Sequence, residues 1–251
     1  MIVSVDQFIE ESNRLDDSDK LFELYKNAME KLGYDRIVYS LITDHQSMNK
    51  KSGHGIMANY PEDWLKYYEE KSYGHKDPVP KQAFKTNNIF TWDQIAKTRD
   101  LEEEEKEVMN GAREAKLLDG VGIPIHGPNG EIAGVGMASS VGGIDQDKIT
   151  LSKIRSLTYQ FHFAYSELAK ETENVNEIYL TKREKEILYW CSEGKSNNDI
   201  AAFLGISNHV IKFHLNNIFS KLNANDRVLA VVKALRFGLI TPSYVKIINP
   251  F

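Results

Sequence analysis

Hydrophobic residues in the first two thirds of the chain follow two different periods, one helical and one extended. Between residues 18 and 33 they recur every three or four positions, which predicts a helix that ends at Gly33. Segments 36–42 and 53–60 are rich in β-branched and aromatic residues and predict strands. The helical stripe consists of Leu21, Phe22, Tyr25, Ala28, Met29 and Leu32.

Residues 120–139 have the pattern of a β-hairpin. Two apolar segments are separated by Pro128-Asn129-Gly130, residues that favour a tight turn. Segments with helical spacing of their apolar residues alternate with these strands along the chain, which predicts a sheet between two layers of helices. The sequence thus favours an α/β/α sandwich with an antiparallel sheet. The helical segments are 61–72, 78–86, 101–117 and 147–170.

The last third of the chain has only helical signals. Residues 171–179 are polar and acidic and predict a linker. Thr181 and Glu184 have the spacing of a capping box, and three further helices are expected from Ser196 to Gly205, from Ser207 to about Leu222 and over about 226–237. The predicted fold class is therefore α+β, with an α/β/α domain at 1–170 and an all-α four-helix domain at 180–251.

The second and third helices of this C-terminal domain are joined by the tight turn Leu204-Gly205-Ile206-Ser207. Such a pair predicts a helix-turn-helix, whose second helix enters the major groove of DNA. Asn and His side chains can bond base edges, and Lys side chains suit phosphates. A four-helix bundle with solvated polar residues is the alternative. The candidate DNA-binding residues are Lys182, Lys195, Ser207, Asn208, His209, Lys212 and Asn216.

The charge distribution changes this picture more than the total charge does. The chain has a net charge of −5, yet residues 180–251 contain ten basic and five acidic residues, which leaves −10 for residues 1–179. A basic C-terminal domain suits a phosphate backbone, although a well-solvated surface would give the same balance. The single Cys191, the lack of a signal-peptide pattern and the lack of a long apolar segment predict a cytoplasmic protein without membrane contact.

Residues 180–231 resemble the DNA-binding domain of the LuxR family. The shared pattern includes LT-x-RE-x-E-x-L, W…GK, IA…L-x-IS, K-x-H and KL. The resemblance implies a four-helix DNA-binding domain in which Glu184, Leu188 and Gly194 are structural. Val210 stands where the family usually has Thr at the start of the recognition helix, so a hydroxyl contact is lost.

Residues 60–79 combine large aromatic side chains with a carboxylate. Trp64 and Tyr68 are four residues apart, so they share one face of a predicted helix. Asp77 precedes Pro78, and Trp92 follows in a predicted loop. Aromatic walls with a few polar groups are typical of a pocket for a small apolar ligand. The same residues also suit simpler roles, the aromatics as core and Asp77 as a helix N-cap.

Over about residues 20–170 the chain resembles the acyl-homoserine-lactone receptors of the LuxR group. The resemblance implies that Trp64 donates its N–H to the lactone carbonyl, that Asp77 accepts the ligand amide N–H and that Tyr60 donates to the amide carbonyl. Gly136 lies where a Ser or Thr often supplies another polar contact. Tyr68 and Trp92 would then form walls of the pocket. The matching residues are Tyr60, Pro61, Trp64, Tyr68, Asp77, Pro78, Trp92 and Gly120.

Two other functions are alternatives for the N-terminal domain. A phospho-receiver needs an acidic cluster at the ends of parallel strands, which the hairpin order does not provide. An enzyme acting on the lactone would use Asp77 with His75, but His54, His75 and His126 lack the spacing of metal ligands. The sequence therefore predicts a regulator that is not an enzyme and has no cofactor besides its signal ligand.

The expected partners are a small-molecule autoinducer, double-stranded DNA and a second copy of the chain. Twofold symmetry would present two helix-turn-helix units to two half-sites about one turn of DNA apart. We expect the dimer to form through the helix at 147–170, whose apolar residues include Leu151, Ile154, Leu157, Phe161 and Leu168. Signal binding would stabilise this dimer and so favour binding to promoter DNA.

Overall fold

A computed structural model of the chain describes residues 4–144, 146–171 and 178–241. The chain forms two compact units, which meet in the sequence between residues 175 and 176. The predicted linker at 171–179 lies mostly outside the described residues. Among the residues described, no helix is long and apolar enough to cross a membrane.

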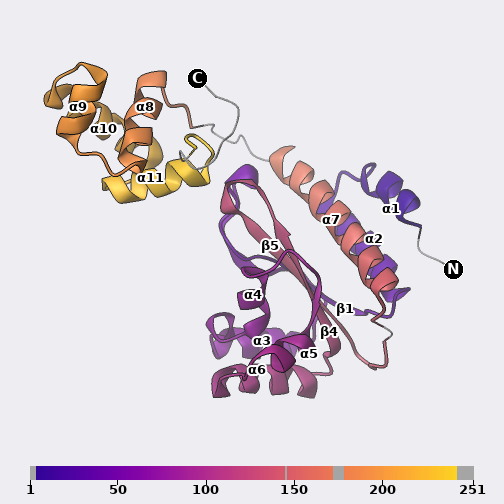
Figure 1. Cartoon of the computed structure of the whole chain (residues 1–251). Helices are drawn as coiled ribbons and strands as arrows, with labels where there is room; N and C mark the ends of the chain where they lie inside the picture. The colour runs from indigo at the N-terminus through magenta and orange to yellow at the C-terminus, as the bar shows by residue number, and fades with distance from the viewer. Residues whose placement is uncertain (1–3, 145, 172–177, 242–251) are drawn as a thin grey trace. The chain divides into compact units, whose positions relative to one another are not determined.

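A five-stranded antiparallel sheet forms the middle layer of the first unit (Figure 1). The hairpin expected at 120–139 is present as the two long strands, whose connecting turn at Pro128–Gly130 has Asn129 at a positive φ of 61°. The strand order is β2-β1-β5-β4-β3, so β5 is the central strand and β4 lies between it and the edge strand β3. The strands are β1 (Arg36–Leu41), β2 (Gly53–Ala58), β3 (Phe90–Thr91), β4 (Leu118–His126) and β5 (Ile132–Ser139).

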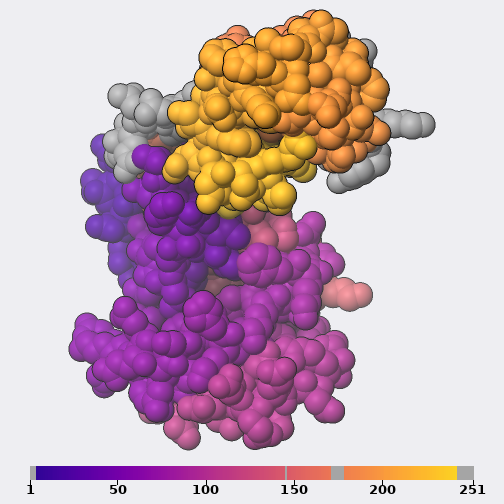
Figure 2. All heavy atoms as spheres, turned by 90° about the vertical axis from the view of Figure 1, so that its left-hand side faces the viewer, coloured from indigo at the N-terminus to yellow at the C-terminus, as the bar shows by residue number. Residues whose placement is uncertain are grey.

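Helices cover both faces of this sheet, as the prediction of an α/β/α sandwich requires (Figure 1). One layer consists of α1 (Val5–Ser12), α2 (Ser18–Glu30) and α7 (Lys148–Glu171). The other consists of α3 (Glu62–Glu70), α4 (Pro78–Ala83), α5 (Trp92–Thr98) and α6 (Glu103–Glu114). Short 3-10 turns at Gln46–Met48 and Tyr73–His75 complete the unit. Figure 2 shows that side chains fill much of the space left open between these ribbons.

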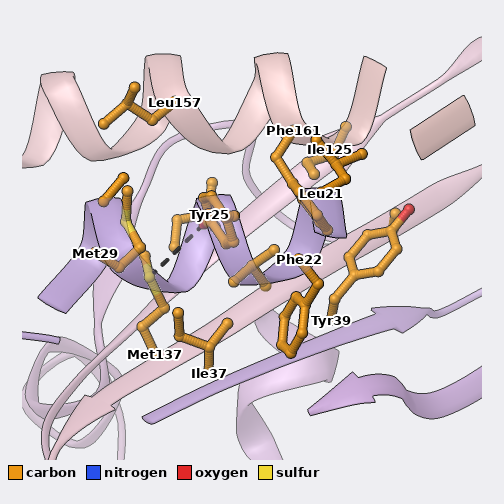
Figure 3. Close-up of a cluster of buried hydrophobic side chains, with 14 of the residues drawn as sticks. Leu21, Phe22, Tyr25, Met29, Ile37, Tyr39, Ile125, Met137, Leu157 and Phe161 are labelled. Atoms are coloured by element: carbon orange, nitrogen blue, oxygen red, sulfur yellow. Dashed lines mark hydrogen bonds between the residues drawn. The ribbon is translucent and has the colours of Figure 1, made fainter. Parts of the chain in front are cut away.

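Alternation along β1 separates the hydrophobic core from the opposite face of the sheet. Ile37 and Tyr39 point into a core formed with α2 and α7 (Figure 3). Leu41 belongs to the same core. The Tyr25 ring of α2 stacks on Phe161 of α7 at 4.4 Å between ring centres. Its hydroxyl lies 2.6 Å from the Thr158 hydroxyl, so this buried phenol is hydrogen-bonded.

The structure adds one helix and corrects two predictions in this unit. Helix α1 has no counterpart among the helices that the sequence predicts. Trp92 does not lie in a loop, because Thr91 and Gln94 form a capping box that makes Trp92 the first residue of α5. The prediction that the apolar stripe of α7 forms the dimer interface is also wrong. Ile154, Leu157 and Phe161 are fully buried against α2 and the sheet, and Leu151 and Leu168 pack beside them.

The second unit contains the four predicted helices, α8 (Lys182–Ser192), α9 (Asn197–Leu204), α10 (Asn208–Leu222) and α11 (Arg227–Arg236) (Figure 1). They surround a core in which Ile211, Leu215 and Ile218 of α10 point inward, as their spacing predicts. Gly205 has a positive φ of 64°, and this left-handed residue ends α9 and turns the chain toward α10.

We predict that Leu157→Ala lowers the free energy of unfolding by about 2–5 kcal/mol, because a fully buried leucine is replaced by a cavity. Ile149→Ala on the same helix is the control, since Ile149 is 79% exposed and its replacement should change stability little. Urea denaturation of both variants measures the difference. A Leu157→Ala protein of normal stability that fails to dimerise would restore the original interpretation of α7.

Candidate functional site

An apolar pocket lies between the sheet and the helices α3 to α6. It has about 680 Å³ of space between its lining atoms, part of which is open to solvent. Most of its walls are aliphatic or aromatic, which suits a small ligand with a large apolar part. The sheet and the residue after β1 contribute Val38, Ser40, Ile42, His54, Phe90, Gly122, Ile123, Pro124, Gly134, Val135 and Gly136, and the helices with their connecting segments contribute Tyr60, Trp64, Tyr68, Asp77, Val79, Pro80, Ala83, Trp92, Val108, Met109, Ala112 and Leu117.

Asp77 is the acidic group of this pocket, and the two roles that the sequence left open for it coexist. One carboxylate oxygen accepts a hydrogen bond from the backbone N–H of Val79 at 2.8 Å and caps α4. The other oxygen accepts the Tyr68 hydroxyl at 2.9 Å. Burial raises the pKa of the Asp77 carboxyl to about 6, because the apolar walls disfavour its charged form. The carboxylate is thus held in place with room to accept a further donor.

Two buried hydrogen-bond donors on the wall of the pocket have no partner among the described residues. They are the hydroxyl of Tyr60 and the indole N–H of Trp92. A buried donor left unsatisfied costs about 1–3 kcal/mol. A ligand with suitably placed oxygen atoms would remove that cost, so the pocket is built to take a ligand that carries acceptors.

Glycines let the pocket aromatics lie directly on the sheet. A Cβ added to Gly120 would lie 2.0 Å from the Trp92 ring, so any larger residue would push this wall out of place. Gly136 lies opposite Val38, and a Cβ there would be 3.2 Å from the Tyr60 hydroxyl. The position that lacks a side-chain hydroxyl in this chain therefore adjoins the unpartnered Tyr60.

Sequence reasoning found the pocket residues of α3 and α4 and missed two polar residues of the sheet. Ser40 and His54 both line the pocket, and the Ser40 hydroxyl lies 3.3 Å from Nδ1 of His54. The alternation of β1 could have identified Ser40, since it is two residues from Val38. His54 gave no such signal, because no residue of its strand is fully buried.

In the second unit, α9 and α10 form the predicted helix-turn-helix. His209, Lys212 and Asn216 are exposed along one side of α10. Lys212 and Asn216 border a shallow surface hollow with Ser196 and Asn197 at the start of α9. Lys182 and Lys195 lie at the start of α8 and before α9, and they do not line this hollow.

Two of the predicted DNA-binding residues already have roles within the unit. The Ser207 hydroxyl caps α10 by accepting the Val210 N–H, and the Asn208 amide donates to the Asn198 side chain. Phe213, which the sequence analysis omitted, is 59% exposed one residue after Lys212. A large apolar side chain on this face is suited to contact with the methyl group of thymine.

Two family models match the chain. The autoinducer binding domain matches residues 17–167, and the domain described as bacterial regulatory proteins, luxR family, matches residues 179–234. The chain belongs to the LuxR family. LuxR-family proteins with these two domains are transcriptional regulators that bind DNA and respond to a small-molecule signal in quorum sensing, so the enzymatic alternative is wrong. The antiparallel sheet likewise excludes a phospho-receiver.

Individual relatives agree with this assignment over most of the chain. The transcriptional activator LuxR of Aliivibrio fischeri is 31% identical over 211 residues, or 83% of each chain. The quorum-sensing regulator RhlR of Pseudomonas aeruginosa is 28% identical over 233 residues, which cover 92% of this chain and 93% of RhlR. The crystal structure of Escherichia coli SdiA has a TM-score of 0.72 at 25% identity and covers 94% of this chain and 98% of SdiA. A second SdiA structure, a complex with octanoyl-rac-glycerol, is equally similar and covers 94% of both chains.

Proposed function

We propose that this regulator binds an N-acyl-homoserine lactone in the pocket of its N-terminal domain and binds promoter DNA as a homodimer. The observation that carries the proposal is the pairing of one buried carboxylate, Asp77, with two buried and unpartnered donors, Tyr60 and Trp92, in one apolar pocket. An acylated amide supplies both an N–H and carbonyl oxygens, together with an apolar chain.

Each polar group of such a ligand has a matching residue. Asp77 accepts the amide N–H, Tyr60 donates to the amide carbonyl, and Trp64 donates its N–H to the lactone carbonyl. Tyr68 and Trp92 flank the ring and the start of the chain. Because Gly136 offers no hydroxyl, Tyr60 is the side chain we assign to the amide carbonyl.

The SdiA complex favours a second ligand class, an acylated glycerol. Octanoyl-rac-glycerol combines an apolar chain with a polar head group, as an acyl-homoserine lactone does. It has no amide N–H, but its free glycerol hydroxyls can donate to the Asp77 carboxylate in place of an amide. The Asp77 carboxylate therefore suits both ligand classes, and it is the resemblance of residues 60–79 to the acyl-homoserine-lactone receptors that favours the lactone.

For the DNA half, we propose that α10 is the recognition helix. His209, Asn216 and Phe213 would contact base edges, and Lys212, Lys182 and Lys195 would contact phosphates. Asn208 and Ser207 would contribute mainly by fixing the start of the helix. We place the signal-binding domain at 1–170, the linker at 171–179 and the DNA-binding domain at 180–251.

Exposed apolar side chains supply candidate surfaces for the homodimer. Tyr159 and Phe163 are exposed on α7, and Val228 and Val232 are exposed on α11. Apolar side chains on the outside of both units suit contacts that would hold two DNA-binding domains at the spacing of two half-sites.

The first test is thermal unfolding with acyl-homoserine lactones of graded chain length. The midpoint should rise for one class of chain lengths, because a ligand that binds only the folded state stabilises it.

Trp64→Phe should weaken the binding of that class roughly tenfold, the loss expected for one hydrogen bond in the pocket. Trp190→Phe in the DNA-binding domain is the matched control and should bind normally.

Ring-opened acyl-homoserine and octanoyl-rac-glycerol complete this panel. The ring-opened compound should bind weakly, since its new carboxylate would be buried beside Trp64. A midpoint that rises with octanoyl-rac-glycerol and with none of the lactones would show that the amide assignment is wrong.

The pH dependence tests the role of Asp77. A ligand N–H stabilises the ionised carboxylate, so binding should lower the pKa of Asp77 below its value of about 6 in the free protein. Affinity should therefore rise about tenfold from pH 5 to pH 7. Asp77→Asn should bind more weakly with little pH dependence, and Asp93→Asn, a residue exposed outside the pocket, should keep the normal profile. An unchanged profile in Asp77→Asn would contradict the assignment.

Lys212→Ala tests the DNA interface. It should weaken binding to all DNA sequences and reduce the slope of log affinity against log salt by about 1. Fluorescence anisotropy over a salt series measures both quantities, with Lys20→Ala on the signal-binding domain as the control. A change in base preference without a change in slope would mean that Lys212 reads bases.

A further inference from the structure

The sheet side of the pocket holds one polar pair, Ser40 and His54, among apolar neighbours. Ser40 lies between Val38 and Ile42 on the pocket face of β1. The residue opposite Ser40 on β5 is Gly134, so no side chain from that position covers the Ser40 hydroxyl. Because Ser40 lines the pocket, a ligand there has access to this hydroxyl.

The hydrogen bonds of the pair leave one hydrogen-bond donor for a ligand. The Ser40 hydroxyl oxygen accepts the backbone N–H of Gly55 at 3.0 Å, and it lies 3.3 Å from Nδ1 of His54. Either group can donate in this hydrogen bond. If the Ser40 hydroxyl donates to Nδ1, the neutral His54 ring carries its proton on Nε2. If His54 donates from Nδ1, the Ser40 O–H is free. In both arrangements one donor remains for the pocket.

His54 is positioned next to the site that would hold the ligand head group. Its ring stacks on Tyr68 with 4.3 Å between ring centres and an 11° angle between planes. Tyr68 in turn donates to Asp77. Stacking against Tyr68 fixes the plane of the imidazole ring, so the hydrogen bonds of its nitrogen atoms must lie near that plane.

The spacing along β1 indicates which part of the ligand the pair would contact. Val38 lies opposite Gly136, beside the Tyr60 hydroxyl, and Ser40 is two residues further along the strand. Two residues of a strand span roughly 6.6 Å. An oxygen on the third acyl carbon, two bonds beyond the amide carbonyl carbon, can reach across that interval with a hydrogen bond at each end.

We propose that Ser40 and His54 recognise an oxygen substituent at C3 of the acyl chain, so that the signal is a 3-oxo or 3-hydroxy acyl-homoserine lactone. This inference rests on the proposed function. A 3-oxo group accepts the available proton from the pair. A 3-hydroxy group can accept that proton as well, and it can also donate to an imidazole nitrogen.

The test compares three lactones of equal chain length, with an unsubstituted, a 3-oxo or a 3-hydroxy acyl group. Dissociation constants are measured by quenching of tryptophan fluorescence in the full-length protein. The wild type should bind at least one oxygenated lactone about tenfold more tightly than the unsubstituted one. In His54→Phe, which keeps the stacking on Tyr68 and loses both nitrogen atoms, this ratio should fall, and in the double variant Ser40→Ala/His54→Phe, which removes every donor of the pair, it should fall to near one.

Two further variants make the outcome decisive. Ser40→Ala should lower the same ratio, and His209→Phe, a matched change in the DNA-binding domain, should leave it unchanged. Equal affinity of the wild type for all three lactones, or a ratio that survives in the double variant, overturns the inference and leaves the proposed function standing. If none of the lactones binds, both fail.

Discussion

A single carboxyl group, that of Asp77, joins the parts from which the signal pocket is made. One of its oxygens caps α4, and the other holds the Tyr68 hydroxyl of α3. Tyr68 then supports the ring of His54 from β2. Two helices and one strand of the sheet are therefore positioned through one charged group that the apolar surroundings disfavour, as its raised pKa shows.

A pocket built in this way is incomplete without its ligand. The buried carboxylate and the unpartnered donors of Tyr60 and Trp92 reduce the stability of the empty domain, while its apolar walls favour an acyl chain. In the proposed complex, the ligand amide removes the unfavourable terms of Asp77 and Tyr60 together. A regulator of this design gains much of its folded-state stability when signal is present, which is a physical route from signal concentration to the amount of functional protein.

The sequence was sufficient for the elements with strong periodicity and for side chains with distinctive spacing. The stripe of α2, the hairpin of β4 and β5 and the helices of the DNA-binding domain follow from local patterns. Tyr60, Trp64, Tyr68 and Asp77 do line one pocket. Local patterns could not show which way α7 faces, because Leu157 and Phe161 suit a core as well as an interface. They also missed His54, whose contact with Tyr68 joins residues from separate elements.

Strand β1 explains how a ligand on one side of the sheet can affect the other side. Its alternate residues serve two environments, since Val38 and Ser40 line the pocket while Ile37 and Tyr39 pack in the core against α2 and α7. The Tyr39 hydroxyl bonds Nδ1 of His162 on α7 at 2.8 Å. A ligand that orders β1 therefore also orders the surface on which α7 packs. Because α7 is the last helix before the DNA-binding domain in the sequence, β1 is the strand through which a ligand in the pocket would affect that helix.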